Sequence, residues 1–390
     1  CEGLSGNLNI PNSVTSIGRY TFYGCKGLTG DLIISDSVTS IGNYAFKKCS
    51  GLKKVEISQS VKVINYGTFS GCTSLESLRL SDELTKIEGY YNTNKDNADE
   101  GAFYNCTSLA TVNIPNTVEE IGNFAFYGCS KLKGKLIIPN TVTYIGVYAF
   151  YNCMGFDETL TIGNNVKNIG NSAFYNCKGF KGDLSIPDSV TSIGSSAFRY
   201  CEGFTGALTI PNSVISIGAS AFKGCKGLIN VSISDEVKTI ESGTFSNCTS
   251  LEFVKLPNKL ISIKCDYSPM YYASEGAFYN CTSLTTIDIP ETVNEIIELA
   301  NKEHVDLRLM GLRNDIPQIC KCADIGVLPS LREGLGLAGI EMIASGLPVV
   351  ASNVHGIVDY VKEGVNGFLA DPNNPDEYAE KLKKLRSQGP

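Results

Sequence analysis

The sequence predicts an elongated, right-handed solenoid of parallel β-strands with about twelve rungs, followed by a small, partial α/β unit. Three observations predict this fold class. One cassette of 23 or 24 residues recurs from the first residue to about Ile296, twelve of the fifteen cysteines occupy the same cassette position, and strand and helix patterns alternate after the repeats end. We therefore expect a solenoid at 1–296, a junction at 297–306 and a second unit at 307–390.

The cassette at Leu184–Cys201 is typical of the repeats. It begins with Leu-x-Ile, whose alternation predicts a strand with one buried face. Pro followed by Asn or Asp predicts a turn, because proline cannot donate to a strand ladder. Val-x-x-Ile-Gly supplies a second apolar pair, and we expect its glycine to permit a tight exit. Ala-Phe-x-x-Cys spaces Phe and Cys by three residues, about one helical turn, so both should face the core.

Stacking is what stabilises such a cassette, because a single copy cannot bury its own apolar face. Stacked copies pair their strands in parallel, with equivalent residues about 4.8 Å apart. We expect the cysteine column to consist of reduced core thiols, since buried Cys behaves as a small hydrophobe. These cysteines are Cys1, Cys25, Cys49, Cys72, Cys106, Cys129, Cys153, Cys177, Cys201, Cys225, Cys248 and Cys281.

The repeated pattern Ile-Pro-x-Ser/Thr-Val-x-x-Ile-Gly-x-x-Ala-Phe-x-x-Cys-x-x-Leu resembles the leucine-rich repeats of BspA-type surface proteins, over about three quarters of the chain. The resemblance implies a leucine-rich-repeat solenoid that acts as a non-enzymatic binding or adhesion scaffold. It also implies a cell-surface or secreted location. We expect a monomer that recognises a protein or glycan partner through its concave sheet or its insertions.

Two insertions of about ten residues interrupt the repeats, at 88–100 and 264–275. They occupy the same cassette position and lie one block duplication apart. Tyrosine gives recognition loops a large contact area with few torsions to freeze, although surface loops also tolerate extra length without any function. Both interpretations stay open. The candidate partner-binding residues are Tyr90 and Tyr91 in the first insertion and Tyr267, Tyr271 and Tyr272 in the second.

Composition excludes several functions. The net charge of −7 argues against a nucleic-acid partner, and no apolar run is long enough for a membrane span. The repeats contain no histidine, so we expect no catalytic triad and no metal site there. Asn-Cys-Thr at Asn105, Asn247 and Asn280 fits the glycosylation pattern, but the same turn recurs as Asn-Cys-Met and Asn-Cys-Lys, so we interpret it as turn chemistry.

The second unit alternates strand and helix patterns, which predicts a Rossmann-like parallel sheet. The expected strands are 307–310, 325–329, 348–351 and 367–369, and the expected helices are 315–323, 336–344 and 375–387. Cys320 and Cys322 lie two apart on one expected helix, so they point to different faces and are interpreted as core thiols.

Candidate chemistry is confined to the strand-loop-helix at 328–342. Gly334 and Gly336 let the backbone approach a ligand closely, and the following helix N-terminus favours phosphate. Glu333 lies in the loop, and Glu341 lies eight residues on, inside the helix. These carboxylates are placed to accept hydrogen bonds from sugar and ribose hydroxyls.

The segments Ala323-Asp-Ile-Gly-Val-Leu-Pro-Ser330, Ala344-Ser-Gly-Leu-Pro-Val-Val-Ala351 and Gly364-Val-Asn-Gly-Phe-Leu369, together with the spaced glutamates, resemble the donor-binding domain of retaining family-4 glycosyltransferases of the GT-B fold. The resemblance implies a UDP- or GDP-sugar ligand and a cytoplasmic location. In that family the first glutamate contacts the donor sugar, the second contacts the ribose, and the loop between them holds the diphosphate. The implied donor-binding residues are Glu333, Gly334, Leu335, Gly336, Leu337 and Glu341, with Glu333 catalytic only in an active enzyme.

The chain departs from that family in what it lacks. The amino-terminal Rossmann domain and the Arg and Lys that neutralise the diphosphate have no place in a chain whose first 290 or so residues are repeats. We therefore expect a scaffold without a cofactor rather than an autonomous transferase. A sugar-nucleotide binder, an inactive remnant that caps the last rung, and a recombined or artificial junction all stay open.

Overall fold

The computed structural model describes residues 3–91, 100–268, 273–288, 326–328, 337–344, 347–354 and 356–388. The chain divides into two compact units, Cys1–Leu307 and Arg308–Pro390. The expected junction at 297–306 and the first expected strand and helix of the second unit lie outside the described residues. The domain boundaries therefore stay predictions.

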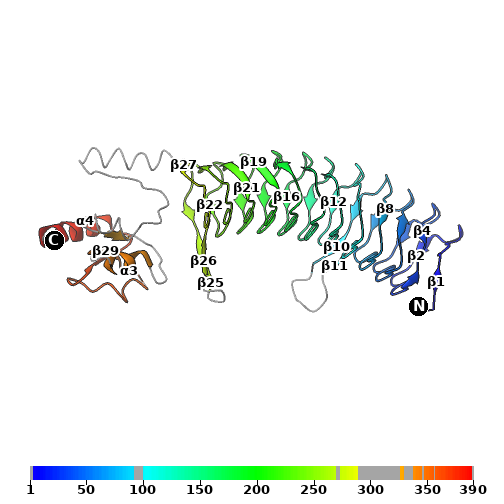
Figure 1. Ribbon diagram of the computed structural model, residues 1–390, viewed down its shortest axis with the longest axis horizontal. Coiled ribbons are helices and arrows are strands. Elements are labelled where there is room, and N and C mark those ends of the chain that lie inside the picture. The colour runs from blue at the N-terminus through cyan, green and yellow to red at the C-terminus, as the bar shows by residue number, and fades with distance from the viewer. Residues whose placement is uncertain are drawn as a thin grey trace. The chain divides into compact units, whose positions relative to one another are not determined.

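The first unit is a solenoid of parallel strands (Figure 1). One column of short strands comes from the second apolar pair of each cassette and forms three parallel sheets, β2–β5, β7 to β20 and β22–β24. Within each sheet the isoleucine pairs with the isoleucine of the next rung, as Ile121 does with Ile145. The strands are β2 Ser16–Ile17, β5 Ser40–Ile41, β7 Val63–Ile64, β9 Lys86–Ile87, β12 Glu120–Ile121, β14 Tyr144–Ile145, β16 Asn168–Ile169, β18 Ser192–Ile193, β20 Ser216–Ile217, β22 Thr239–Ile240 and β24 Ser262–Ile263.

A second column of parallel strands contains the Leu-x-Ile segments and the residues just before them. In β4, for example, the side chain of Leu32 is buried and that of Ile33 is exposed. The strands are β1 Ser5–Gly6, β3 Gly27–Leu28, β4 Asp31–Ile33, β6 Lys54–Glu56, β8 Ser77–Arg79, β13 Leu136–Ile137, β15 Leu160–Thr161, β17 Gly182–Asp183, β19 Phe204–Thr209, β21 Gly227–Ser232, β23 Phe253–Lys255 and β27 Thr286–Asp288.

The described part of the solenoid has about eleven turns, close to the expected number of about twelve rungs. Its first column contains eleven strands among the described residues.

The core is a continuous stack of phenylalanine rings. Successive rings of the Ala-Phe-x-x-Cys segments lie 5.1–5.7 Å apart between centroids and 1–13° from parallel. These segments form successive turns rather than a helix. The Cys49 N–H donates to the Phe46 carbonyl in the same rung, whereas the Phe46 N–H donates to the Thr68 carbonyl in the next rung. Left-handed residues, such as Tyr44 with φ of 62°, allow this alternation.

The predicted free thiols are confirmed for the described cysteines of the column, which begins at Cys25 and ends at Cys281. Ten of these thiols donate to the carbonyl oxygen of the phenylalanine one rung earlier, at 2.9–3.2 Å. The Phe126 carbonyl, for example, accepts both the Cys129 N–H at 3.2 Å and the Cys153 thiol at 3.1 Å. Burial raises the pKa of these thiols, well above its usual range in Cys153.

The glycine of Val-x-x-Ile-Gly has a role other than the expected tight exit. Gly42 and Gly146 do not have a positive φ. A Cβ at Gly146 would instead lie 2.4 Å from the carbonyl carbon of Gly122 in the preceding rung. These glycines are therefore required by the close approach of successive backbones.

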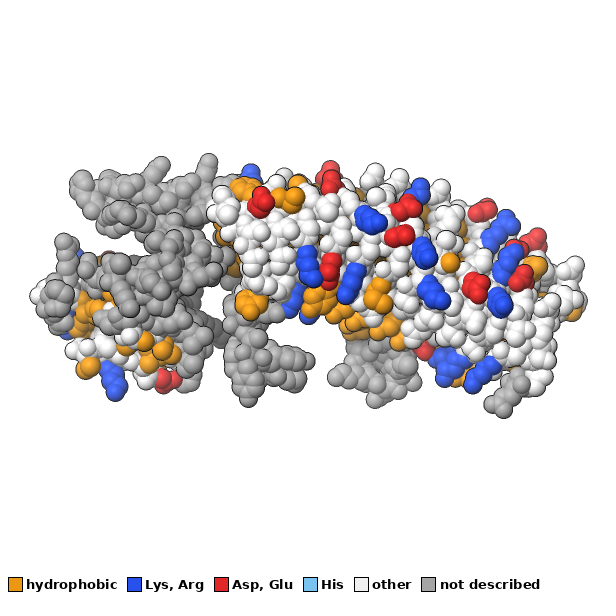
Figure 2. All heavy atoms as spheres, in the orientation of Figure 1, with side chains coloured by type: hydrophobic (Ala, Val, Ile, Leu, Met, Phe, Trp, Pro, Cys, Tyr) orange, Lys and Arg blue, Asp and Glu red, His pale blue; other side chains and the backbone are white. Residues whose placement is uncertain are grey.

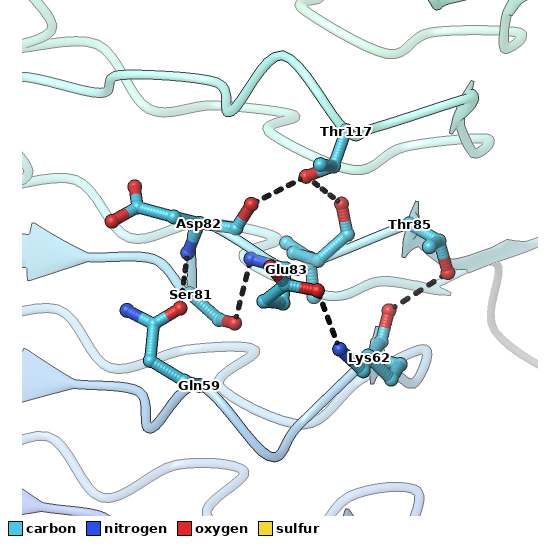
Figure 3. A network of polar contacts seen from close by, with 8 residues as sticks. Gln59, Lys62, Ser81, Asp82, Glu83, Thr85 and Thr117 are labelled. Atoms are coloured by element: carbon cyan, nitrogen blue, oxygen red, sulfur yellow. Dashed lines mark hydrogen bonds and ion pairs between the residues drawn. The ribbon is translucent and has the colours of Figure 1, made fainter.

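The Ser or Thr before the conserved cassette valine links neighbouring turns. The Thr117 hydroxyl donates to the carbonyl of Leu84 at 2.7 Å and lies 2.9 Å from that of Asp82, as Figure 3 shows. Thr141 and Ser189 make the equivalent bonds to the preceding rung at 2.6 and 2.7 Å. Asn105, Asn247 and Asn280 all adopt a left-handed conformation, in agreement with turn chemistry at the Asn-Cys-Thr positions.

The second unit contains a parallel sheet in the order β28–β29–β30. Its elements are β28 Gly326–Leu328, α3 Leu337–Ala344, β29 Val349–Ser352, β30 Gly367–Ala370 and α4 Pro375–Gln388, which match the expected strands and helices of this part of the chain. Val350 and Ala370 pack against Tyr378 of α4, and the Tyr378 hydroxyl lies 2.5 Å from that of Ser352. Val349 and Ala351 face the opposite side of the sheet, where Met342 of α3 packs.

Within the described part of the chain, no helix is long and apolar enough to cross a membrane.

Candidate functional site

Both insertions begin and end as antiparallel hairpin stems that project from the same side of the solenoid (Figure 1). The first stem pairs β10 Gly89–Tyr90 with β11 Glu100–Gly101. The second pairs β25 Cys265–Ser268 with β26 Ala273–Gly276. The backbone of Tyr267 lies in β25, whereas Tyr271 and Tyr272 lie outside the described residues.

The first stem forms one wall of a pocket of about 310 Å³, which we call the tyrosine pocket. The rings of Tyr20 and Tyr44 stack at 4.9 Å, Tyr66 stands nearly perpendicular to Tyr44, and Tyr90 lies 5.4 Å from Tyr66. The pocket is lined by Arg19, Tyr20, Tyr44, Lys47, Tyr66, Tyr90 and Glu100.

Glu100 is the buried charged group of this pocket, with 5% of its surface exposed. Its Oε1 forms an ion pair with Lys47, and its Oε2 has no hydrogen-bond partner among the described residues. Lys47 also lies over the ring of Tyr44, with Nζ 4.9 Å from the centroid. Burial, together with the nearby Tyr66 and Glu100, raises the pKa of Tyr44 to about 12.

Two glycines lie next to residues of the pocket. Gly67 occupies the cassette position that carries a tyrosine at Tyr44, and a Cβ at Gly67 would lie 2.3 Å from the Tyr44 ring. Gly101 takes the same place in the next rung, directly opposite Gly89 in the hairpin. A Cβ at Gly101 would lie 1.9 Å from the carbonyl oxygen of Phe124, so close contacts with neighbouring atoms require glycine at both positions.

A second aromatic cluster, the ladder surface, lies on the carboxy-terminal side of the first insertion. Tyr104, Tyr127, Tyr151 and Tyr175 stack on successive rungs at 4.5–4.8 Å. Phe124 and Tyr148 form a parallel column at 4.9 Å, and Tyr91 of the insertion lies 6.1 Å from Phe124. The two columns touch through Tyr148 and Tyr151, 5.4 Å apart. Figure 2 shows hydrophobic side chains, which include tyrosines, gathered along the edge from which the insertion projects.

The structure therefore brings Tyr90 and Tyr91 to two different clusters. Tyr90 packs on Tyr66 in the tyrosine pocket, and Tyr91 packs on Phe124 in the ladder surface. Both are exposed, by 40% and 46% respectively. Their role in binding stays a prediction.

Sequence reasoning missed both clusters, although a signal was present. The ladder tyrosines directly follow the core phenylalanine of Ala-Phe-x-x-Cys and recur with the spacing of the cysteines. The fold does not require aromatic residues in the pocket, because the second copy of the duplicated block carries Ser196, Ser220 and Ser242 at the places of Tyr20, Tyr44 and Tyr66.

The glycosyltransferase-like residues are only partly described. Glu333, Gly334, Leu335 and Gly336 lie outside the described residues. The backbone of Leu337 begins α3 and that of Glu341 lies one turn further, so strand β28 and helix α3 follow one another in the expected order. No metal-binding group of His, Cys, Asp and Glu is present in the described residues.

Parallel strands stacked at one cassette per rung, a buried phenylalanine column and a cross-rung thiol column define the first unit as a leucine-rich-repeat solenoid. The chain belongs to the BspA-type leucine-rich repeat family, whose model matches residues 2–98, 96–182 and 181–296. A carboxy-terminal segment at residues 288–388 matches the family of glycosyl transferases group 1.

Curated glycosyltransferases are similar to a short part of the chain. The UDP-Gal:alpha-D-GlcNAc-diphosphoundecaprenol alpha-1,3-galactosyltransferase of Escherichia coli is 44% identical over 79 residues, which are 20% of this chain and 20% of that protein. A D-inositol 3-phosphate glycosyltransferase of Mycobacterium sp. (strain KMS) is 36% identical over 93 residues, 24% of this chain and 21% of that protein. The chain thus spans about a fifth of the length of these relatives.

Solved leucine-rich repeat proteins match the solenoid. One from Bacteroides ovatus is 29% identical with a TM-score of 0.48, and the match covers 71% of this chain and 76% of that one. A leucine rich cell surface protein from Faecalibacterium prausnitzii is 25% identical with a TM-score of 0.38, covering 70% of this chain and 83% of that one.

Proposed function

We propose that the protein is a non-enzymatic binding scaffold that presents the tyrosine pocket and the ladder surface to a protein or glycan partner. The observation that carries this proposal is the gathering of aromatic side chains on both sides of the first insertion. Tyrosine is enriched at binding hot spots because it buries a large area and freezes few torsions. The proposal includes a cell-surface or secreted location, where such a partner would be met, and a monomeric state.

The chemistry of the ladder surface supports this role. Its tyrosines are only half-buried, so part of each residue is accessible to a partner. Stacking has already fixed their torsions, and a partner that covers them loses little further side-chain entropy. Burial and the neighbouring Tyr175 raise the pKa of Tyr151 to about 12, so this hydroxyl stays uncharged at physiological pH.

The test compares three full-length proteins on arrays of defined glycans and purified extracellular proteins. A ladder variant carries Tyr127→Ser, Tyr151→Ser and Tyr175→Ser. A control variant carries Ile33→Ser, Ile137→Ser and Ile215→Ser, which replace three exposed apolar side chains outside both clusters. We expect wild type and control to bind the same array member and the ladder variant to bind at least about tenfold more weakly. Equal binding by all three proteins would contradict the proposal for this surface.

A second candidate function is binding of a nucleotide sugar by the carboxy-terminal segment, with Glu333 and Glu341 as acceptors for the sugar and ribose hydroxyls. The match to glycosyl transferases group 1 and the order of strand β28 and helix α3 favour it. Calorimetry with UDP-galactose, UDP-glucose and GDP-mannose, repeated on Glu341→Ala, tests it. Heat that disappears in Glu341→Ala supports the function, and no heat from any donor excludes it.

A further inference from the structure

The tyrosine pocket contains a buried carboxylate oxygen that has no hydrogen-bond partner among the described residues. Oε1 of Glu100 pairs with Lys47, whereas Oε2 is buried and has no partner among the described residues. Leaving a buried charged acceptor unpaired is costly. A ligand that brings a hydrogen-bond donor to this oxygen would remove that cost.

The charges of the pocket narrow the class of ligand. The lining contains two cationic side chains, Arg19 and Lys47, and one carboxylate, Glu100, so it carries a net charge of +1. Their cationic groups already lie over tyrosine rings, with the Arg19 guanidinium 4.8 Å from the Tyr20 centroid. A cationic ligand would meet two cations and find these rings engaged. A simple anion would bring no donor for Oε2. A neutral or acidic polyol carries no positive charge and brings hydroxyl donors for Oε2, so it fits the pocket on both counts.

The shape of the pocket points to the same class. Its volume of about 310 Å³ is at the lower end of the range for small-molecule sites. Tyr66 is turned 86° from Tyr44, so the rings enclose the space on more than one side. Aromatic walls suit the C–H face of a pyranose ring, whose hydroxyls lie around its edge.

We infer that the tyrosine pocket binds a single sugar residue, with one hydroxyl donating to Glu100 Oε2 and one ring face on a tyrosine. The inference rests on the proposed scaffold function, because it names one subsite for the partner. A hydrogen bond from a hydroxyl to an ionised carboxylate is stronger than a hydrogen bond between neutral groups. Lys223 and Glu275 occupy the places of Lys47 and Glu100 in the duplicated block, but the serines there replace the aromatic walls, so we expect one sugar site and not two.

The experiment uses saturation-transfer difference NMR on the full chain. The probes are the methyl glycosides of glucose, galactose, mannose, N-acetylglucosamine and glucuronic acid, and disaccharides with each of these sugars at the non-reducing end. Binding of a methyl glycoside or of a disaccharide supports the inference. The relative affinities of the two kinds of probe show whether the pocket prefers a free monosaccharide or the end of a glycan. We expect at least one sugar to bind, and its Kd to rise at least about tenfold in Glu100→Gln.

Two tyrosine variants provide the matched comparison. Tyr90→Ser removes a wall of the pocket, and Tyr23→Ser removes a ring of similar exposure, 39% against 40%, that does not line it. Sugar binding should weaken in Tyr90→Ser and persist in Tyr23→Ser. If circular dichroism shows that Glu100→Gln is unfolded, the comparison of sugar binding in Tyr90→Ser and Tyr23→Ser tests the inference instead.

The inference is wrong if no probe binds or if binding survives in Glu100→Gln and Tyr90→Ser. Loss of partner binding in the ladder variant without any sugar binding would overturn the sugar site alone. Sugar binding that depends on Glu100, with no partner lost by the ladder variant, would instead overturn the role of the ladder surface.

Discussion

At the scale of single residues, the cysteine column is explained by a shared acceptor. Each phenylalanine carbonyl bonds the cysteine N–H of its own rung and, in ten cases, the thiol of the next. Alanine would fill the column less completely and leave the carbonyl with one partner. A hydroxyl in place of the thiol would be more costly to bury. Cysteine is therefore a small hydrophobe with a weak donor in the right place.

We predict that these thiols do not react in the folded protein. Burial raises the pKa of Cys72, Cys153 and Cys201 well above its usual range, so almost no thiolate is present at pH 8. Iodoacetamide labelling followed by peptide mass spectrometry should modify them only in guanidinium, and dithiothreitol should leave the melting temperature unchanged. Disulfide-linked peptides between neighbouring rungs would contradict this account.

The tyrosine clusters predict a loss of stability at alkaline pH. Folding raises the pKa of Tyr44 and Tyr151 to about 12, above the unfolded value near 10, so folding favours their neutral form. This contribution is complete below pH 10 and is lost as the pH rises from 10 to 12. The core thiols act in the same direction from about pH 9, as for Cys129.

Urea unfolding midpoints measured from pH 8 to 11.5 check this prediction, together with tyrosinate absorbance at 295 nm. Tyr151→Phe should reduce the alkaline loss of stability, because phenylalanine does not titrate. A midpoint that stays constant to pH 11.5 would show that the two tyrosines ionise as freely in the folded chain as in the unfolded one.

At the scale of single rungs, backbone contact decides which residues are tolerated. The Gly146 position allows no Cβ because the Gly122 carbonyl carbon would lie 2.4 Å away. Gly18 has the same cassette position in the first described rung, yet a Cβ there would meet only the Thr21 Oγ1 at 3.3 Å. The same motif is therefore under different constraints inside the stack and at its end.

We predict that Gly146→Ala lowers the free energy of unfolding by about 3 kcal/mol or more, because a backbone atom must move. Gly18→Ala is the matched control and should change it by less than about 1 kcal/mol. Chemical denaturation of the two variants measures the difference. Equal effects would mean that rung spacing adapts to a methyl group.

Much of the structure of the single rungs could be predicted from the sequence. The period of the cassette and the positions of Phe46 and Cys49 identified the strands, turns and core columns. The tyrosine pocket could not be found in the same way, because it needs Gly67 without a side chain and a hairpin that places Tyr90 opposite Glu100. Such lateral contacts depend on how rungs stack, which a one-dimensional pattern does not contain.

At the scale of the whole molecule, the chain contains two units with separate hydrophobic cores. The solenoid core includes residues from Ile10 to Phe278, and the clusters of the second unit include residues from Met342 to Leu385. The solenoid is extended by adding equivalent rungs, whereas the described part of the second unit contains a three-stranded parallel sheet with two helices.

We predict two unfolding transitions in differential scanning calorimetry. Val350→Ala removes buried volume from the second unit only. It should lower the free energy of unfolding of that unit by about 1–2 kcal/mol and move its transition to a lower temperature. The solenoid transition should not move. A parallel shift of both transitions would favour the interpretation of the second unit as a cap of the last rung.

The most direct test of the scaffold function is a ratio of two dissociation constants. The ladder variant and the control variant each lose three exposed or half-exposed side chains, but only the ladder variant loses the aromatic surface beside the first insertion. For the partner identified on the arrays, we predict a Kd for the ladder variant at least about tenfold above that of the control variant, measured at a temperature at which both variants are folded. A ratio near one would contradict binding through this surface.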